Sequence, residues 1–282
     1  MDHPTLTLNQ PADGTPGVVI PQLGFGVFKV PPETTQGIVE AALAAGYRHI
    51  DTATAYRNEA AVGAALAAVG LPRDEVFITT KLANADHLAG DIRGALERSL
   101  EALGVDAVDL YLIHWPMPAR ELYLGVWEQF IHFAAEGLTR AIGVSNFQIP
   151  HLEHIISTTG VTPAVNQVEL HPVFQQKPLR AYLREHGIAV EAWGPLGQGR
   201  WALDSLAPIA DAATAHGKTP AQVILRWHLQ SGTIAIPKAS TREHMDENFA
   251  VVDFELSGAE MAAIDALDTN QRLGGNPDTN NG

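Results

Sequence analysis

The stretch Arg48-His49-Ile50-Asp51-Thr52-Ala53-Thr54-Ala55-Tyr56 begins as a short apolar strand and ends in a carboxylate and a phenol. Two later apolar runs also end in a group that can carry a proton. Lys81 closes the run 76–80, and His114 closes the run 108–113. If these runs are neighbouring parallel strands, an acid, a phenol, an amine and an imidazole meet at one end of one sheet.

This first run is one of eight strands that the sequence predicts, and helical segments alternate with them. The predicted strands are 22–26, 48–51, 76–81, 108–114, 139–145, 164–167, 188–193 and 233–236. The predicted helices are 33–45, 58–69, 88–103, 119–136, 148–158, 177–186 and 220–230. This alternation indicates the α/β class, and eight strands favour a closed (β/α)8 TIM barrel over an open doubly wound sheet.

The segments outside this alternation are short. Residues 5–8 and 18–20 flank a turn at 11–14 and predict an N-terminal β-hairpin. The tail 272–282 is rich in Gly and Asn, and we expect it near the active-site face. Because no linker or internal repeat appears, we expect residues 1–282 to form a single domain.

Composition excludes several classes of function. The net charge of −14 argues against a nucleic-acid partner, which needs a basic face. The absence of cysteine excludes disulfides, thiolate nucleophiles and zinc–thiolate sites. No apolar window is long enough to span a membrane, and residues 1–10 show no signal peptide. We therefore expect a cytoplasmic protein and, since no amphipathic extension is visible, a monomer.

In a barrel, polar residues at the carboxyl ends of the strands carry the chemistry. Tyr56 alone is a poor acid, with a pKa near 10, but the ammonium of Lys81 favours its phenolate and lowers that pKa. Asp51 would keep Lys81 charged, and His114 could donate a hydrogen bond to a carbonyl oxygen or share the proton with Tyr56. These four residues predict a site that reduces carbonyl groups.

Further strand ends suit a nicotinamide. Ser145, Asn146 and Gln167 offer donors and acceptors for an amide, and Trp193 offers a face for ring stacking. In so acidic a chain an anionic cofactor needs a local basic cluster, for which Lys238 with Arg242 is the best candidate. No Rossmann glycine fingerprint follows any strand.

Each residue also has a simpler interpretation. His49 and His171 could be structural residues that only form hydrogen bonds. Trp193, taken singly, could be a core residue, and Asp51 with Lys81 could be a buried ion pair. The collection of polar residues at one end of the strands favours a functional site, because structural polar residues would be scattered between both ends.

Six separated segments together resemble the motif set of the aldo-keto reductases. They are IDTATAYRNE (50–59), TKL (80–82), LIHWP (112–116), IGVSNF (142–147), NQVE with HP (166–169, 171–172) and IPK (236–238). Segments 21–31 and 191–199 are similar to the bacterial branch that includes the 2,5-diketo-D-gluconate reductases.

The resemblance implies an NADPH-dependent reductase in which Tyr56 is the general acid of a tetrad with Asp51, Lys81 and His114. Ser145, Asn146 and Gln167 would bind the carboxamide, Trp193 would stack on the nicotinamide, and no metal would be needed. The remaining implied cofactor contacts are Gly194, Leu196, Gln198 and Gly199 at the pyrophosphate, and Lys238, Ser240, His244, Glu247 and Asn248 at the adenosine end. The implied substrate pocket contains Phe25, Phe28, Ala83 and Trp115.

Two positions depart from the family pattern. Ala83 stands where the family usually has Trp, which predicts a wider and less aromatic pocket. His244 stands where an Arg commonly holds the 2′-phosphate of NADPH. Because a neutral imidazole lacks the guanidinium fork, we expect a weaker preference for NADPH and acceptance of NADH as well.

Two other classes of function compete with a reductase. One is a cofactor-binding regulatory protein on the same barrel, and the other is a metal-dependent hydrolase begun by His114 and Asp51. A panel of carbonyl substrates and a metal analysis would discriminate among the three.

Overall fold

A computed structural model of the 282-residue chain describes residues 3–9 and 17–281. Its first two strands, β1 (Thr5–Thr7) and β2 (Val19–Pro21), pair antiparallel as predicted. The predicted turn 11–14 lies outside the described residues. Leu8 and Ile20 of this hairpin are buried against Phe77 and Val165, which stand at the starts of two barrel strands. The hairpin therefore closes the amino-terminal end of the barrel.

The eight predicted strands form one parallel sheet in chain order. They are β3 (Phe25–Gly26), β4 (His49–Asp51), β5 (Phe77–Leu82), β6 (Val108–Ile113), β7 (Thr139–Ser145), β8 (Val165–Glu169), β9 (Ala189–Trp193) and β10 (Ile234–Ala235). A parallel bridge between Leu23 and Ala235 joins the last strand to the segment before the first. The sheet therefore closes into the predicted barrel, with the carboxyl ends of all eight strands on one face.

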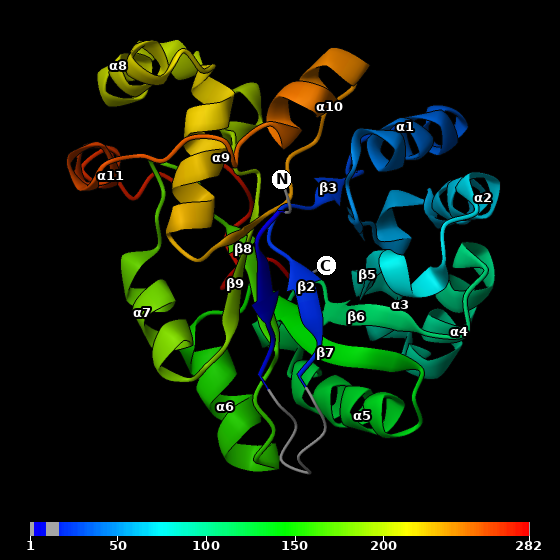
Figure 1. The fold of residues 1–282 in the computed structure, drawn as a ribbon. Helices are drawn as coiled ribbons and strands as arrows, with labels where there is room; N and C mark the ends of the chain where they lie inside the picture. Colours follow the sequence, from blue (N-terminus) through cyan, green and yellow to red (C-terminus); the bar gives the residue numbers. More distant parts are fainter. Residues whose placement is uncertain (1–2, 10–16, 282) are drawn as a thin grey trace.

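The helices lie around the outside of the strands (Figure 1). They are α1 (Pro32–Ala45), α2 (Glu59–Val69), α3 (Asn84–Ala89), α4 (Ile92–Leu103), α5 (Tyr123–Ala135), α6 (Ile149–Thr159), α7 (Lys177–Glu185), α8 (Ala207–His216), α9 (Pro220–Gln230), α10 (Arg242–Phe249) and α11 (Gly258–Asp265). None of them is both long enough and apolar enough to cross a membrane, in the part of the chain described.

The helix predictions were wrong at some helix ends and missed three helices. The single helix predicted over 88–103 is two helices, because Gly90 adopts a left-handed conformation with φ of 75° and ends α3. The helix predicted to start at residue 119 begins at Tyr123, after a 3-10 turn over Pro118–Arg120. Helices α8, α10 and α11 were not predicted, since their exposed faces are broad and their buried residues are few.

Candidate active site

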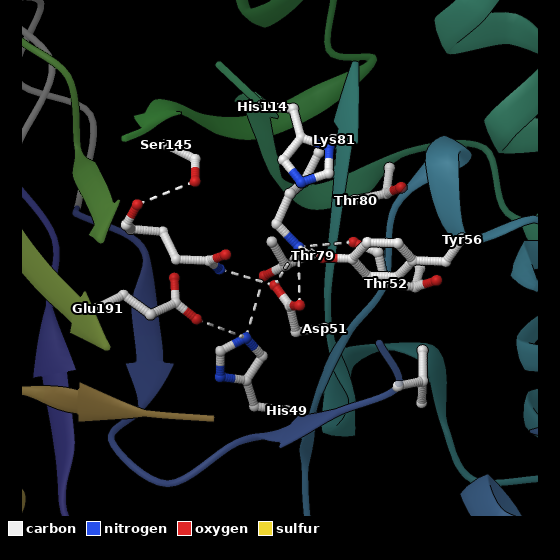
Figure 2. A network of polar contacts seen from close by, with 12 residues as sticks. His49, Asp51, Thr52, Tyr56, Thr79, Thr80, Lys81, His114, Ser145 and Glu191 are labelled. Atoms are coloured by element: carbon white, nitrogen blue, oxygen red, sulfur yellow. Dashed lines mark hydrogen bonds and ion pairs between the residues drawn. The ribbon is translucent and has the colours of Figure 1, made fainter. Parts of the chain in front are cut away.

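Four polar side chains meet at the carboxyl ends of β4, β5 and β6 (Figure 2). Asp51 ends β4, Lys81 lies next to the end of β5, and His114 follows β6. Tyr56 ends a 3-10 turn, Thr54–Tyr56, that leaves β4. The sequence prediction that parallel strands bring these four residues together is confirmed.

Lys81 is the centre of this group, and its side chain is completely buried. Its Nζ donates to both carboxylate oxygens of Asp51, at 2.7 and 2.8 Å, and to the carbonyl of Thr52 at 2.9 Å. The Tyr56 hydroxyl lies 3.5 Å from the same nitrogen. Burial alone would lower the pKa of Lys81, but the Asp51 carboxylate and Tyr56 outweigh burial and raise it. Lys81 is therefore a fixed cation beside the phenol.

The phenol of Tyr56 is less acidic than the sequence predicted. Burial raises its pKa above the ordinary value of tyrosine, and the charge of Lys81 lowers it only in part, while Asp51 adds to the increase. The expectation that the neighbouring ammonium gives a net lowering is wrong in the protein alone, because desolvation is the larger effect. Tyr56 keeps its proton at neutral pH, as a general acid must.

His114 faces the phenol with a neutral imidazole. Its ring centroid lies 5.8 Å from that of Tyr56, in an edge-on arrangement. Burial lowers the pKa of His114 to about 3, with a further contribution from the charge of Lys81. A neutral imidazole can donate one hydrogen bond to a carbonyl oxygen without competing with Tyr56 as a proton donor.

The residues expected at a nicotinamide form a second network beside the first. Ser145 Oγ donates to the backbone carbonyl of Gln167 at 2.9 Å, and Asn146 Nδ2 donates to Ser145 Oγ at 3.0 Å. Trp193 Nε1 donates to Asn146 Oδ1 at 2.8 Å, which fixes the indole ring at the end of β9. Gln167 Nε2 donates to Asp51 Oδ2 at 2.8 Å and so connects the two networks. The structure brings all four residues to the mouth of the barrel.

A cavity of about 350 Å³ follows the ends of β9 and β10. Five of the predicted cofactor residues line it: Leu196, Lys238, His244, Glu247 and Asn248. Ser240 is exposed and is not among the lining residues. The cavity also contains residues that the sequence did not single out: Leu203, Asp204, Thr219, Pro220 and Ala221. An ammonium, an imidazole and an amide line this hollow and suit the polar end of a dinucleotide, and the carboxylates of Asp204 and Glu247 line it as well.

The loop after β9 follows a series of tight turns. Gly194, Gln198 and Gly199 all have positive φ angles, of 59°, 53° and 70°. A Cβ atom at Gly197 would overlap the ring of Trp201, so the indole lies directly on this loop. Such a glycine-rich turn lets backbone N–H groups approach an anionic ligand closely.

The predicted pocket residues do not all lie in one place. Phe28 is 46% exposed, and its ring centroid is 5.0 Å from that of Tyr56. Ala83 is buried at the start of α3. Phe25 is fully buried and packs edge-on against Tyr47 in the core. Of the two phenylalanines, only Phe28 has a described contact with Tyr56.

The C-terminal tail lies against the two tryptophans of the site. Trp115 is close to the tail at Gly275, and Trp193 leaves no room for a side chain at Gly274. The buried carboxylate of Glu169, at the end of β8, accepts hydrogen bonds from the backbone N–H groups of Leu273 and Gly274. The expectation that the tail lies near the active-site face is confirmed.

Glu191 is a residue that the sequence analysis missed. It is completely buried on β9, and His49 Nε2 lies 3.7 Å from its Oε1 (Figure 2). A visible signal was the acidic residue inside the apolar run of β9, two positions before Trp193. Over residues 3–9 and 17–281, no three acidic or histidine side chains are placed to hold a metal ion.

Comparison with known proteins gives the family. The family model described as "Aldo/keto reductase family" matches residues 22–269. An aldo-keto reductase of Mycolicibacterium smegmatis is 49% identical over 278 residues, which is 99% of this chain and 98% of that protein. The methylglyoxal reductase DkgA of Salmonella typhimurium is 49% identical over 262 residues, covering 93% and 94% of the two chains.

Solved structures agree in fold over nearly the whole chain. The D53A mutant of Gox0644 in complex with NADPH is 41% identical and covers 99% of both chains, with a TM-score of 0.92. An aldo/keto reductase from Brucella melitensis is 47% identical and covers 95% of this chain and 100% of that one, with a TM-score of 0.88. The chain therefore belongs to the aldo/keto reductase family, a family of oxidoreductases.

Proposed function

We propose that this protein reduces aldehydes and ketones to alcohols with a reduced nicotinamide cofactor, and that Tyr56 is the general acid. The observation that carries the proposal is the buried chain Asp51–Lys81–Tyr56, in which one ammonium joins a carboxylate to a phenol. In this proposal residues 1–282 form one reductase domain that works as a monomer in the cytoplasm.

The cofactor would supply a hydride to the carbonyl carbon, and the residues of the chain would manage the proton. His114 would donate a hydrogen bond to the carbonyl oxygen and orient it toward the phenol. Tyr56 would then transfer its proton to that oxygen as negative charge develops there. Lys81, held by Asp51, would stabilise the resulting phenolate, since a fixed cation in a dry site acts with little screening.

Residues of both networks would hold the cofactor. Ser145, Asn146 and Gln167 would face the carboxamide, and Trp193 would stack on the nicotinamide ring. The loop with Gly194, Leu196, Gln198 and Gly199 would cover the pyrophosphate. Lys238, Ser240, His244, Glu247 and Asn248 would meet the adenosine end, and the cavity in which four of these five lie supports this assignment.

The charges of this cavity support a weak preference for NADPH, so that NADH is also accepted. Among the described residues that line the cavity, Lys238 is the one permanent cation, whereas Asp204 and Glu247 are acidic. His244 offers an imidazole without the two-pronged hydrogen bonding of an arginine. A 2′-phosphate would therefore gain less here than in a site with an arginine at this position.

The substrate class we propose is small carbonyl and dicarbonyl compounds. Relatives named methylglyoxal reductase support this class. Ala83, in place of a large aromatic side chain, would widen the pocket near Phe28, whose ring is 46% exposed. Phe25, Phe28, Ala83 and Trp115 remain the predicted pocket residues, and Trp115 would face the substrate together with the tail.

The test is the variant Tyr56→Phe. We expect the rate of NADPH oxidation with methylglyoxal and with a panel of aldehydes and ketones to fall by about 100-fold or more, because the proton donor is lost. Binding of NADPH, measured by quenching of tryptophan fluorescence, should not change. Tyr182→Phe, which removes a phenol from α7, is the matched control and should retain full activity. Full activity of Tyr56→Phe would refute the assigned role.

A further inference from the structure

Glu191 lies in an environment in which an ionised carboxylate is energetically unfavourable. Its side chain is completely buried inside the barrel, and neither carboxylate oxygen has a hydrogen-bond partner among the described residues. Transfer of an unpaired carboxylate out of water is far more costly than transfer of the neutral acid. The geometry by itself therefore favours a proton on Glu191.

The groups that face Glu191 come from three other strands. Asp51 and His49 lie on β4, and Lys81 lies on β5. Gln167 lies on β8, in direct register with Glu191. The Nε2 atom of His49 lies closer to Thr79 Oγ1, at 3.0 Å, than to Glu191. Burial lowers the pKa of His49 to about 3. The imidazole is therefore neutral and does not form an ion pair with Glu191.

The other neighbours also leave Glu191 without a counter-charge of its own. Lys81 directs its ammonium to the carboxylate of Asp51, and Gln167 Nε2 is also bound there. The adjacent strand β10 offers Ile234 and Ala235, which carry no charge. Burial, followed by repulsion from Asp51, raises the pKa of Glu191 to about 8, although the charge of Lys81 and the nearby amide of Gln167 each oppose part of this increase.

We propose that Glu191 is a positioning residue that holds a proton beneath the Asp51–Lys81 pair, and that its ionisation makes Tyr56 a weaker proton donor. This inference rests on the proposed role of Tyr56 and deepens it. With the proton in place, Asp51 and Lys81 balance each other in the barrel interior. Without it, the interior carries a second carboxylate charge that no cation balances.

The effect on the reaction follows from the proton transfer. In the reduction the O–H bond of Tyr56 breaks, its proton goes to the carbonyl oxygen, and a hydride from the reduced nicotinamide goes to the carbonyl carbon. A phenolate charge then develops next to Lys81. An ionised Glu191 repels this charge, since it raises the pKa of both Tyr56 and Lys81. The reduction should therefore slow as pH rises through the titration of Glu191.

The first experiment compares pH profiles of kcat and kcat/KM for carbonyl reduction between about pH 6 and pH 9. We expect the wild-type rate to fall by about threefold or more near pH 8. Glu191→Gln should lack this fall, and Glu191→Asp should retain it. Glu169→Gln is the matched control: burial raises the pKa of Glu169, but His171 and the tail N–H groups outweigh this and lower it, so that the fall should persist. A fall in Glu191→Gln equal to that of wild type would overturn the proposal.

The second experiment needs no turnover and separates this inference from the proposed function. Infrared difference spectra of the protein without cofactor should show a carboxylic acid band that disappears near pH 8 in the wild type and is missing from Glu191→Gln. A wild-type protein without this band at pH 7 overturns the inference, whatever the activity of Tyr56→Phe. Because absence of the band from the wild type is decisive, the inference can be refuted even if Glu191→Gln does not fold.

Discussion

Lys81 Nζ donates to both carboxylate oxygens of Asp51, at 2.7 and 2.8 Å, inside a barrel where both side chains are almost fully removed from solvent. In such a pair each charge compensates the other, so that loss of one partner leaves an unpaired charge in the barrel interior. The same ammonium reaches the phenol of Tyr56, so that the pair links the stability of the barrel to its proposed chemistry.

Removal of one partner of this pair should be more harmful than removal of both. Lys81→Met leaves Asp51 as an unpaired buried charge and should lower the free energy of unfolding by about 3–5 kcal/mol. The double variant Asp51→Asn/Lys81→Met should recover most of that loss, measured by urea denaturation. Both variants should lose reductase activity by about 100-fold or more, because the phenolate loses its cation. Equal stability of the single and double variants would contradict this prediction.

Cofactor preference should respond to His244. His244→Arg adds a guanidinium to the cavity that contains Lys238, and we expect the ratio of kcat/KM for NADPH to that for NADH to rise by about tenfold or more. His186→Arg, at the end of α7, adds the same charge elsewhere and is the control. A ratio that is already several orders of magnitude in the wild type would refute the proposed dual use of cofactors.

The position of the C-terminal tail should depend on Glu169. Its carboxylate accepts two backbone N–H groups of the tail, and Glu169→Gln replaces one acceptor oxygen with an NH2 group that opposes them. We expect faster trypsin cleavage after Arg272 and a higher KM for the carbonyl substrate. Asp278→Asn changes an exposed charge of the same tail and should alter neither quantity appreciably. Unchanged proteolysis of Glu169→Gln would show that these hydrogen bonds do not hold the tail.

The stability of the protein should depend on pH through Glu191. A carboxyl whose pKa is near 8 when folded and about 4.3 when unfolded binds its proton more tightly in the folded state. Its contribution is complete below the unfolded pKa and is lost as pH rises through the folded pKa. Between about pH 5 and pH 8, wild type should lose on the order of 1 kcal/mol per pH unit relative to Glu191→Gln. If the free energies of unfolding of the two proteins keep a constant difference across this pH range, the result would count against a protonated Glu191.

The sequence was a good guide where local patterns determine structure. Strand runs followed by polar residues predicted the parallel sheet, and the position of His114 after β6 was readable from the chain alone. Helices α8, α10 and α11 escaped because they bury few side chains, which leaves little apolar periodicity. The division of 88–103 into two helices depended on the conformation of Gly90, which composition does not specify.

The sequence by itself determined the order of strands and helices, the four polar residues at the strand ends and the family resemblance, because each depends on residue type and spacing. Only the tertiary structure decided the electrostatics of the site. Closure of the barrel brings Glu191 to His49, 142 residues earlier in the chain, and excludes water from both. Desolvation also decides the direction of the Tyr56 pKa shift, against the effect of Lys81. Burial and approach across a barrel are properties of the assembled fold, and no local pattern contains them.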